Sequence, residues 1–592
     1  MAYQEAQDQE PDVLRFPILT TTLLERPNYS AKFGHVFEGA SAALDFFYKF
    51  GPREEKMMSQ FYFPTQVLTQ QRNIESDDNF ELKNGLIYFD NISLNDPTLL
   101  SLVEGYPKAQ EGVSQRFSVR QDIKWNNTGW LRVFMHHLRK QVLLTAASRN
   151  ARVKAVHFSY PESFGLNQRK QFETDLRWVW GDSGDLSLQL TSESEAARDY
   201  VVEGRNQHVI FDIGGGTTEI IAFDNQEPIF QTSFKLAAWQ INDYVVNAPT
   251  FREKFVEAIE RTAKQEVLHG KIVDSLLEKF MIDPQSPRDR DTVLQLWLGL
   301  LQQIMDANRS SSGALLAQIL NYLRTEAESG DAVQGFFLSN TLLLGGLSYY
   351  AGQLLNKASE GNFEEHRTFS LSRVPITMTG NGSRLYNMLT HQEVPFSSVM
   401  ENLFRCGLPD DCKEGLDVEF KGLFQYQGET APKTSVALGL LCTEEDQHWE
   451  DVPRANIVGE EGYSCGAQEK RTEFDDSLVD FYQMVAERKI HFDPPQKVPE
   501  VLDHFLTRLG EELPYGRNGP FEVIPGCKSD WEEDLKTDLY LRAQRHIKNR
   551  GYQNASLAEE IVGGSDTKRP LEPLFMTQIA GLLDAVREHY AK

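Results

Sequence analysis

The sequence is poor in cysteine. Only five cysteines occur among the 592 residues, and the two nearest, Cys406 and Cys412, are six positions apart. This spacing matches neither a disulfide framework nor a zinc-binding motif. The cysteine content therefore indicates a protein of a reducing compartment, and we expect it in the cytoplasm.

Positive charge is also scarce. Lysine and arginine total 60 against 86 aspartates and glutamates, which gives a formal net charge of −26, and no run of five basic residues occurs. A surface of this sign repels nucleic-acid phosphates and anionic lipids. The composition therefore predicts that neither nucleic acid nor a membrane is a partner. The polar, acidic first residues predict no secretory signal.

Uncharged segments long enough to span a bilayer are rare. Phe336–Leu355 lacks charged residues for twenty positions, which is the length of a transmembrane helix. However, it contains Asn340, Thr341 and the glycine pair Gly345 and Gly346. These polar and small residues favour a buried core helix, in which the two glycines allow close helix packing.

The order of the apolar segments predicts an α/β fold, and the chain length predicts more than one domain. Strands alternate with helices in the pattern of a sheet with crossover connections. The expected strands are Val153–Ser159, Leu186–Leu190, His208–Asp212 and Pro375–Met378, and the expected helices are Gln168–Val179 and Glu193–Val202. Residues 237–323 are expected to be mostly helical. Residues 444–592 combine acidic composition with short amphipathic helices.

The strongest motif is Phe211–Ile220 (FDIGGGTTEI), which follows an apolar strand. Consecutive glycines let a backbone approach an anion and point its N–H groups toward it. Carboxylates beside such a turn can hold Mg²⁺ through water or orient an attacking water. The predicted phosphate-binding residues are Gly214, Gly215, Gly216, Thr217 and Thr218, and the predicted metal-binding carboxylates are Asp212 and Glu219.

This motif resembles the second phosphate loop of the actin, heat-shock-chaperone and sugar-kinase superfamily. Val153–Phe164 and Ser192–Tyr200 resemble a strand with its loop and the first connecting helix of the DnaK-type chaperones, and Thr434–Leu441 resembles the second connecting helix. The resemblance implies that Glu193 contacts the water shell of the metal and, with Asp212, serves catalysis.

Thr379–Leu385 (TGNGSRL) resembles the adenosine loop of the same superfamily. The resemblance implies that Gly380 and Gly382 pass under the base, that Ser383 reaches it and that Arg384 stacks on its face. It therefore implies ATP and Mg²⁺ as ligands.

The fold that the resemblance implies is a two-lobed, actin-like (ribonuclease-H-like) ATPase fold, closest to the DnaK-type nucleotide-binding domain. The expected domains are an N-terminal segment (1–60), a first lobe (61–205), a second lobe (206–443) with a helical insert (237–323), and a helical, acidic C-terminal extension (444–592). The expected function is that of an ATP-binding, chaperone-like conformational switch acting on protein partners.

The superfamily's first phosphate loop is not found, because residues 1–60 contain no Asp-x-Gly. That loop either lies upstream of Met1 or is missing. If it is missing, the alternative is a scaffold protein with a degenerate nucleotide site, which binds partners through the insert and the C-terminal extension. A small-molecule kinase on the same fold is a further alternative.

Overall fold

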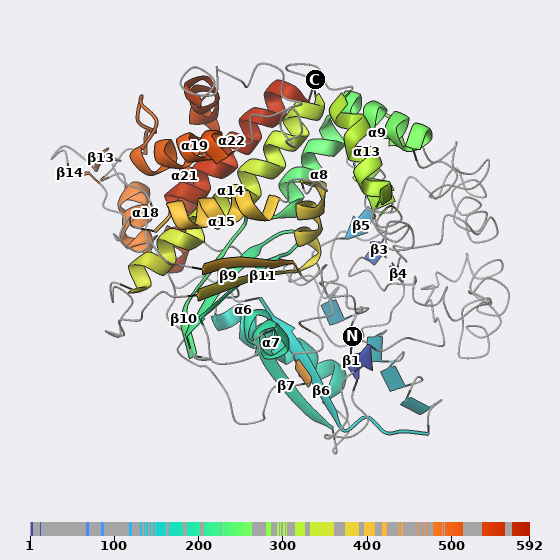
Figure 1. Ribbon diagram of the computed structural model, residues 1–592. Coiled ribbons are helices and arrows are strands. Elements are labelled where there is room, and N and C mark those ends of the chain that lie inside the picture. Colours follow the sequence, from blue (N-terminus) through green and yellow to red (C-terminus); the bar gives the residue numbers. More distant parts are fainter. Residues whose placement is uncertain are drawn as a thin grey trace.

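A computed structural model gives the fold (Figure 1). It describes residues 150–161, 166–181, 186–201, 207–224, 227–262, 280–285, 314–325, 332–359, 373–389, 396–408, 417–422, 477–487, 492–512, 536–562 and 571–591, with short pieces elsewhere. Among those short pieces are the two-stranded pairs of β1 (Ala2–Tyr3) with β2 (Asp12–Val13) and of β13 (Ser464–Cys465) with β14 (Lys470–Arg471), and a three-stranded sheet of β3 (Val67–Thr69), β4 (Gly85–Ile87) and β5 (Ser118–Arg120).

The main sheet has five strands in the order β10-β9-β8-β11-β12. These strands are β8 (His208–Ile213), β9 (Thr218–Asp224), β10 (Glu227–Phe234), β11 (Arg373–Thr379) and β12 (Asp417–Gly422). Because β9 is antiparallel to both β8 and β10, while β11 is parallel to β8 and β12, β9 alone runs against the other four. The sheet is therefore mixed, and both β8 and β11 end at the same edge.

A smaller parallel pair precedes this sheet. It consists of β6 (Ala155–Tyr160) and β7 (Ser187–Ser192), connected by helix α6 (Leu166–Trp180) and followed at once by α7 (Glu193–Val201). The alternation expected from the sequence is confirmed here. Trp180 at the end of α6 is buried and packs edge-on against Phe158 of β6.

The two faces of the main sheet are covered differently. Alternate residues of a strand point to opposite faces. On one face Val209, Phe211 and Ile213 of β8 join the large core formed with the helices. On the other face Ile210 packs with Ala197 of α7. In Figure 1, accordingly, α14, α15 and the C-terminal helices gather on one side of the sheet, and α6, α7, β6 and β7 lie on the other.

Helix α14 (Ala332–Ser359) is the centre of the large core. It packs against α15 (Phe396–Cys406), α22 (Leu574–Tyr590), α8 (Ala238–Asn247) and α9 (Pro249–Thr262). Its glycines permit close contact: a Cβ on Gly352 would lie 2.1 Å from the carbonyl oxygen of Phe404, and one on Gly346 would lie 3.2 Å from Ile579. The expectation of a buried core helix is confirmed. None of the described helices has the length and apolar character needed to cross a membrane.

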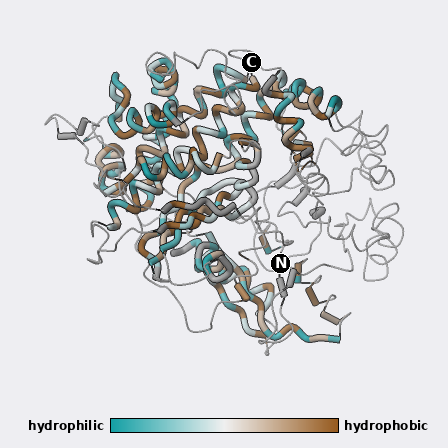
Figure 2. Tube along the Cα trace, in the orientation of Figure 1, coloured by the Kyte–Doolittle hydropathy of each residue, from teal (hydrophilic) through white to brown (hydrophobic). Residues whose placement is uncertain are grey.

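The described helices after residue 444 belong to the same core. They are α18 (Leu478–Ala486), α19 (Glu500–Glu512), α21 (Lys536–Val562) and α22. Phe505 of α19 and Phe575 of α22 pack edge-on at 5.5 Å, and Phe575 stacks on Tyr350 of α14. Figure 2 shows hydrophobic residues along the strands and along the helices that cover them. These helices therefore add to the core of the main sheet, as do α8, α9 and α13 (Ala314–Thr325) of the expected helical insert.

Candidate functional site

The first candidate loop connects β8 to β9. Asp212 and Glu219 lie directly opposite each other on these antiparallel strands, and only 9% and 3% of their surfaces are exposed. Directly opposed side chains on one face of a sheet lie about 5 Å apart at their Cβ atoms, and two like charges there repel. The pair thus brings two carboxylates, the kind of oxygen ligand that Mg²⁺ takes from proteins, to the end of β8.

The three glycines of this loop have different surroundings. The Gly214 N–H donates to the carbonyl oxygen of Thr217 at 2.9 Å, which closes the turn. A Cβ added at Gly215 or at Gly216 would meet nothing within 4 Å. None of the three has a left-handed φ, so the alternating right- and left-handed backbone of an N–H nest is not formed here. Neither packing nor backbone conformation therefore requires glycine at 215 and 216.

The loop is held by the start of helix α8. The N–H groups of Ala238 and Trp239 donate to the carbonyl oxygens of Gly214 and Gly215 at 3.3 and 2.8 Å. The Thr218 hydroxyl is buried and donates to the Leu236 carbonyl at 2.5 Å. The carbonyl side of the loop is thus bound to the protein, and the tip at Gly215 remains exposed.

The second candidate loop follows β11 and lies against the first. Thr379 pairs with Asp212 in the parallel ladder, and Gly380 has a left-handed φ of 77°. A Cβ on Gly380 would lie 2.3 Å from Asp212 Oδ1, and one on Gly382 would lie 2.7 Å from the carbonyl oxygen of Gly214. The two loops, 168 residues apart between Asp212 and Gly380, therefore touch at one sheet edge.

The rest of the second loop, which the sequence predicted as a glycine-rich loop, forms a 3₁₀ helix, η2 (Asn381–Met388). Ser383 is fully buried, and its hydroxyl donates to the Gly380 carbonyl at 2.6 Å. Of Arg384 the structure describes the backbone in η2, and its side chain lies outside the described part. In this structure the buried Ser383 hydroxyl thus donates inside its own loop.

Helix α7 lies over the face that carries Asp212 and Glu219. Glu193 is its first residue, and Arg198 lies above the ring of Phe223 at 5.7 Å. Val436, from the expected second connecting helix, packs in the same small cluster as Ala197. The small residues Ala437 and Gly439 of that helix lie outside the described residues. The two segments that resemble connecting helices therefore meet on one face of the sheet.

A capping box at the start of α7 was missed in the sequence. The Ser192 N–H donates to Glu195 Oε2 at 3.0 Å, and the Glu195 N–H donates to Ser192 Oγ at 3.1 Å. This reciprocal pair satisfies two backbone N–H groups at the N-terminus of the helix. The Ser-x-x-Glu spacing in Ser192–Glu195 was sufficient to predict it. Glu195 is therefore buried as the acid that caps helix α7.

Glu193 does not complete a three-carboxylate group. Within the described part of the chain, no three histidine, cysteine, aspartate or glutamate side chains lie close enough together to hold a metal ion. The two opposed carboxylates of Asp212 and Glu219 still fit Mg²⁺, because this ion keeps several waters and commonly takes only one or two carboxylates from the protein.

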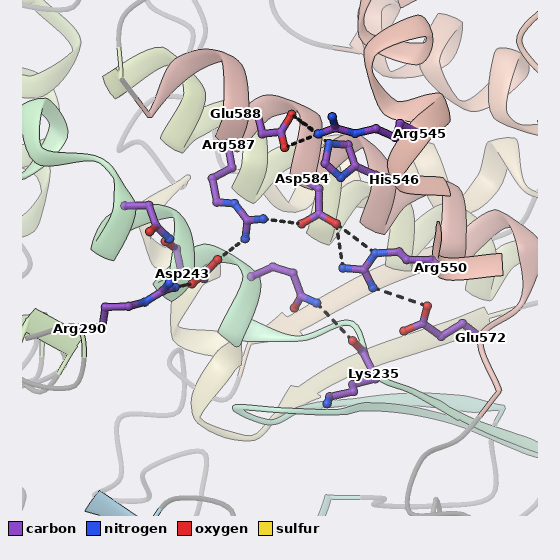
Figure 3. Close-up of polar contacts among 12 residues, drawn as sticks. Lys235, Asp243, Arg290, Arg545, His546, Arg550, Glu572, Asp584, Arg587 and Glu588 are labelled. Carbon is purple, nitrogen blue, oxygen red and sulfur yellow. Dashed lines mark hydrogen bonds and ion pairs between the residues drawn. The ribbon is translucent and has the colours of Figure 1, made fainter. Parts of the chain in front are cut away.

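An ionic network connects α8, which holds the first loop, to the C-terminal helices (Figure 3). Asp243 of α8 pairs with Arg290 and with Arg587 of α22. Arg587 also contacts Asp584 at 3.1 Å, and Asp584 contacts Arg550 of α21 at 3.1 Å.

The network ends at Glu572, which is 3.7 Å from Arg550. Burial raises the pKa of the Glu572 carboxyl, and the positive charge of Arg550 opposes this shift. Glu572 is buried just before α22 and Asp584 is half-buried on α22, so a chain of ion pairs joins α21 and α22 to the loop-bearing helix α8.

A buried arginine fixes the other end of α8. Arg252 is fully buried, and its guanidinium donates to the carbonyl oxygens of Val245, Val246 and Ile282. The last carbonyls of a helix lack partners within the helix and carry partial negative charge. Burial lowers the pKa of Arg252 from its usual value. Arg252 thus satisfies the C-terminus of the helix whose N-terminus holds the glycine loop.

Comparisons with known proteins assign no family. No protein family matches this sequence, and no curated protein matches it. Among solved structures, the crystal structure of MreB5 of Spiroplasma citri bound to ADP is similar to 64% of this chain and 87% of that chain, with 10% sequence identity and a TM-score of 0.28. A likeness of this strength carries no weight for the function of the chain.

Proposed function

We propose that this protein binds a Mg²⁺–ATP complex at the edge of the main sheet where β8 and β11 end. The observation that carries the proposal is the direct contact between the two glycine loops, with the Gly380 Cβ position 2.3 Å from Asp212 Oδ1. Ligands of open α/β sheets bind beyond the carboxyl ends of the strands. Both loops stand at such ends, although they are far apart in the sequence.

Each part of the site has a chemical role in this proposal. Asp212 and Glu219 hold the waters of Mg²⁺, whose charge offsets that of the phosphates. Gly215 and Gly216 let phosphate oxygens approach the backbone, since no side chain occupies that space. Thr217 supplies a hydroxyl at the loop tip. On the side of the second loop, the base lies over Gly380 and Gly382 with Arg384 beside it, while the buried Ser383 supports the loop through its bond to the Gly380 carbonyl.

We propose further that nucleotide binding acts as a conformational switch in a two-lobed, chaperone-like protein with protein partners in the cytoplasm. Helix α7 supports this, because it contacts both strands of the β6–β7 pair and the strands β8 and β9 of the main sheet. A ligand that draws Glu193 at the start of α7 toward Asp212 would move one sheet relative to the other. ATP hydrolysis at this site would depend on Asp212 and Glu193 positioning water.

Equilibrium binding of ATP, measured by calorimetry with and without Mg²⁺, tests the proposal. Asp212→Asn keeps the side-chain size and removes one charge of the opposed pair, so the variant should fold while losing roughly tenfold or more in Mg²⁺–ATP affinity. Asp224→Asn is the matched control, because Asp224 lies at the far end of the same hairpin, opposite Glu227. Equal affinities in all three proteins, or no binding by the natural chain, would refute the proposal.

A scaffold without nucleotide is the second candidate. Two observations favour it: the hydroxyls of Thr218 and Ser383 both donate to backbone carbonyls of the protein, and the glycine loop has no left-handed residue. In a scaffold the two loops would serve only to pack against each other at the ends of β8 and β11. The same calorimetry separates the candidates, because a scaffold gives no heat with ATP at any Mg²⁺ concentration.

A further inference from the structure

We infer that Trp239 forms one wall of the nucleotide site and stacks on the base or sugar of the ligand. The inference rests on the proposed function, and it assigns the nucleoside part of the ligand to a residue that the glycine motifs do not include. The indole would cover the nucleoside while the loop tip takes the phosphates.

The exposure of Trp239 is the first observation. Its surface is 44% exposed, whereas Trp180 and Trp297 are 1% and 0% exposed. An aromatic ring of this size usually contributes its area to a core or an interface. The flanking residues Ala238 and Gln240 are buried, so the exposed indole stands on the outer side of the first turn of α8.

The position of Trp239 beside the loop is the second observation. Its backbone N–H donates to the carbonyl oxygen of Gly215 at 2.8 Å, so its Cα is fixed next to the loop tip. In an α-helix the Cα–Cβ bond tilts toward the N-terminus, and the side chain covers the turn that precedes it. This helix geometry directs the Cβ of Trp239 toward the side of the loop tip, next to the open space at Gly215 and Gly216, where a Cβ would meet nothing within 4 Å.

The chemistry of indole selects the nucleoside rather than the phosphates. The ring has a broad π-face and a single N–H donor, and it carries no charge. Phosphate oxygens need several donors or a cation, which Trp239 cannot supply. Nucleic bases stack on aromatic side chains, and alanine substitution of such a ring weakens binding by about 5- to 150-fold.

The test compares two ligands that share the phosphate chain. Mg²⁺–ATP and Mg²⁺–tripolyphosphate are titrated into the full chain and into Trp239→Ala, Trp239→Phe and Trp178→Ala. Trp178 of α6 is the matched control because it is 41% exposed and lies in another part of the fold. We expect Trp239→Ala to lose about 5- to 150-fold in ATP affinity and to bind tripolyphosphate unchanged. Trp239→Phe and Trp178→Ala should stay close to the natural chain.

Three outcomes overturn the inference in distinguishable ways. Unchanged ATP affinity in Trp239→Ala shows that the ring does not touch the ligand. An equal loss for ATP and tripolyphosphate shows that Trp239 acts on the loop and not on the nucleoside. If the natural chain binds neither ligand, the proposed function fails together with the inference. Tryptophan fluorescence gives a second measurement: the change caused by ATP should be largely absent in Trp239→Phe.

Discussion

Alanine substitutions at the glycines of the two loops should have opposite effects on stability. Gly215→Ala and Gly216→Ala place a methyl group where nothing lies within 4 Å, on a backbone without a left-handed φ. Where the native backbone accepts alanine, the substitution stabilises a protein by about 0.4–1 kcal/mol, because it restricts the unfolded chain. We therefore expect these two variants to unfold at the same or a slightly higher urea concentration.

Gly380→Ala should be strongly destabilising. The φ of 77° costs a residue with a Cβ about 1–2 kcal/mol. The Cβ would also lie 2.3 Å from Asp212 Oδ1 and 2.4 Å from the Ile213 carbonyl oxygen, and overpacking of this kind adds about 1–3 kcal/mol. The expected loss in the free energy of unfolding is thus about 2–5 kcal/mol. Gly382 has no left-handed φ, so in Gly382→Ala only the steric overlap of the new Cβ with the first loop is destabilising. The expected loss in the free energy of unfolding is about 1–3 kcal/mol.

Urea unfolding followed by circular dichroism measures all four variants, and Mg²⁺–ATP calorimetry follows for those that fold. If Gly215 and Gly216 are glycines because a ligand approaches them, their alanine variants should lose affinity for Mg²⁺–ATP at full stability. A loss of more than about 1 kcal/mol of stability in either variant would contradict the reasoning, since it would show that the protein itself needs those glycines. Normal stability of Gly380→Ala would refute the contact between the loops.

Two further predictions concern the surroundings of the site. Arg252→Met should lower the free energy of unfolding by about 3 kcal/mol, because the carbonyl oxygens of Val246 and Ile282 lose the guanidinium as their donor. Arg261→Met, at an exposed arginine of the same helix, should change the free energy of unfolding by less than about 0.5 kcal/mol. Comparable losses in both variants would contradict the capping role of Arg252. For Glu572, the folded chain retains the carboxyl proton at a pH where the unfolded chain has lost it, because burial raises the pKa in the folded state. Stability should therefore fall as pH rises from about 4.3 through the folded pKa, and Glu572→Gln should reduce this fall. Urea midpoints across this range measure the slope, and an unchanged slope in the variant would contradict the assignment to Glu572.

The sequence was sufficient for features that depend on short stretches of chain. Strand β8, the turn at Gly214–Gly216 and the glycines of α14 were predicted from alternation, glycine content and apolar length. These features are local because backbone conformation and side-chain periodicity set them within a few residues. The capping box of Ser192 and Glu195 was equally local, and its spacing was present in the sequence.

What lies opposite a residue was decided only by the tertiary structure. The parallel pairing of β11 with β8 places Gly380 against Asp212 across 168 positions of sequence, and no local pattern encodes that distance. The internal bonds of Thr218 and Ser383, and the shared core that joins the C-terminal helices to α14, also depend on long-range packing. The sequence therefore determined which segments are strands, turns and buried helices. The register between distant strands determined which side chains meet, because strands gain pairing energy only once both are folded together.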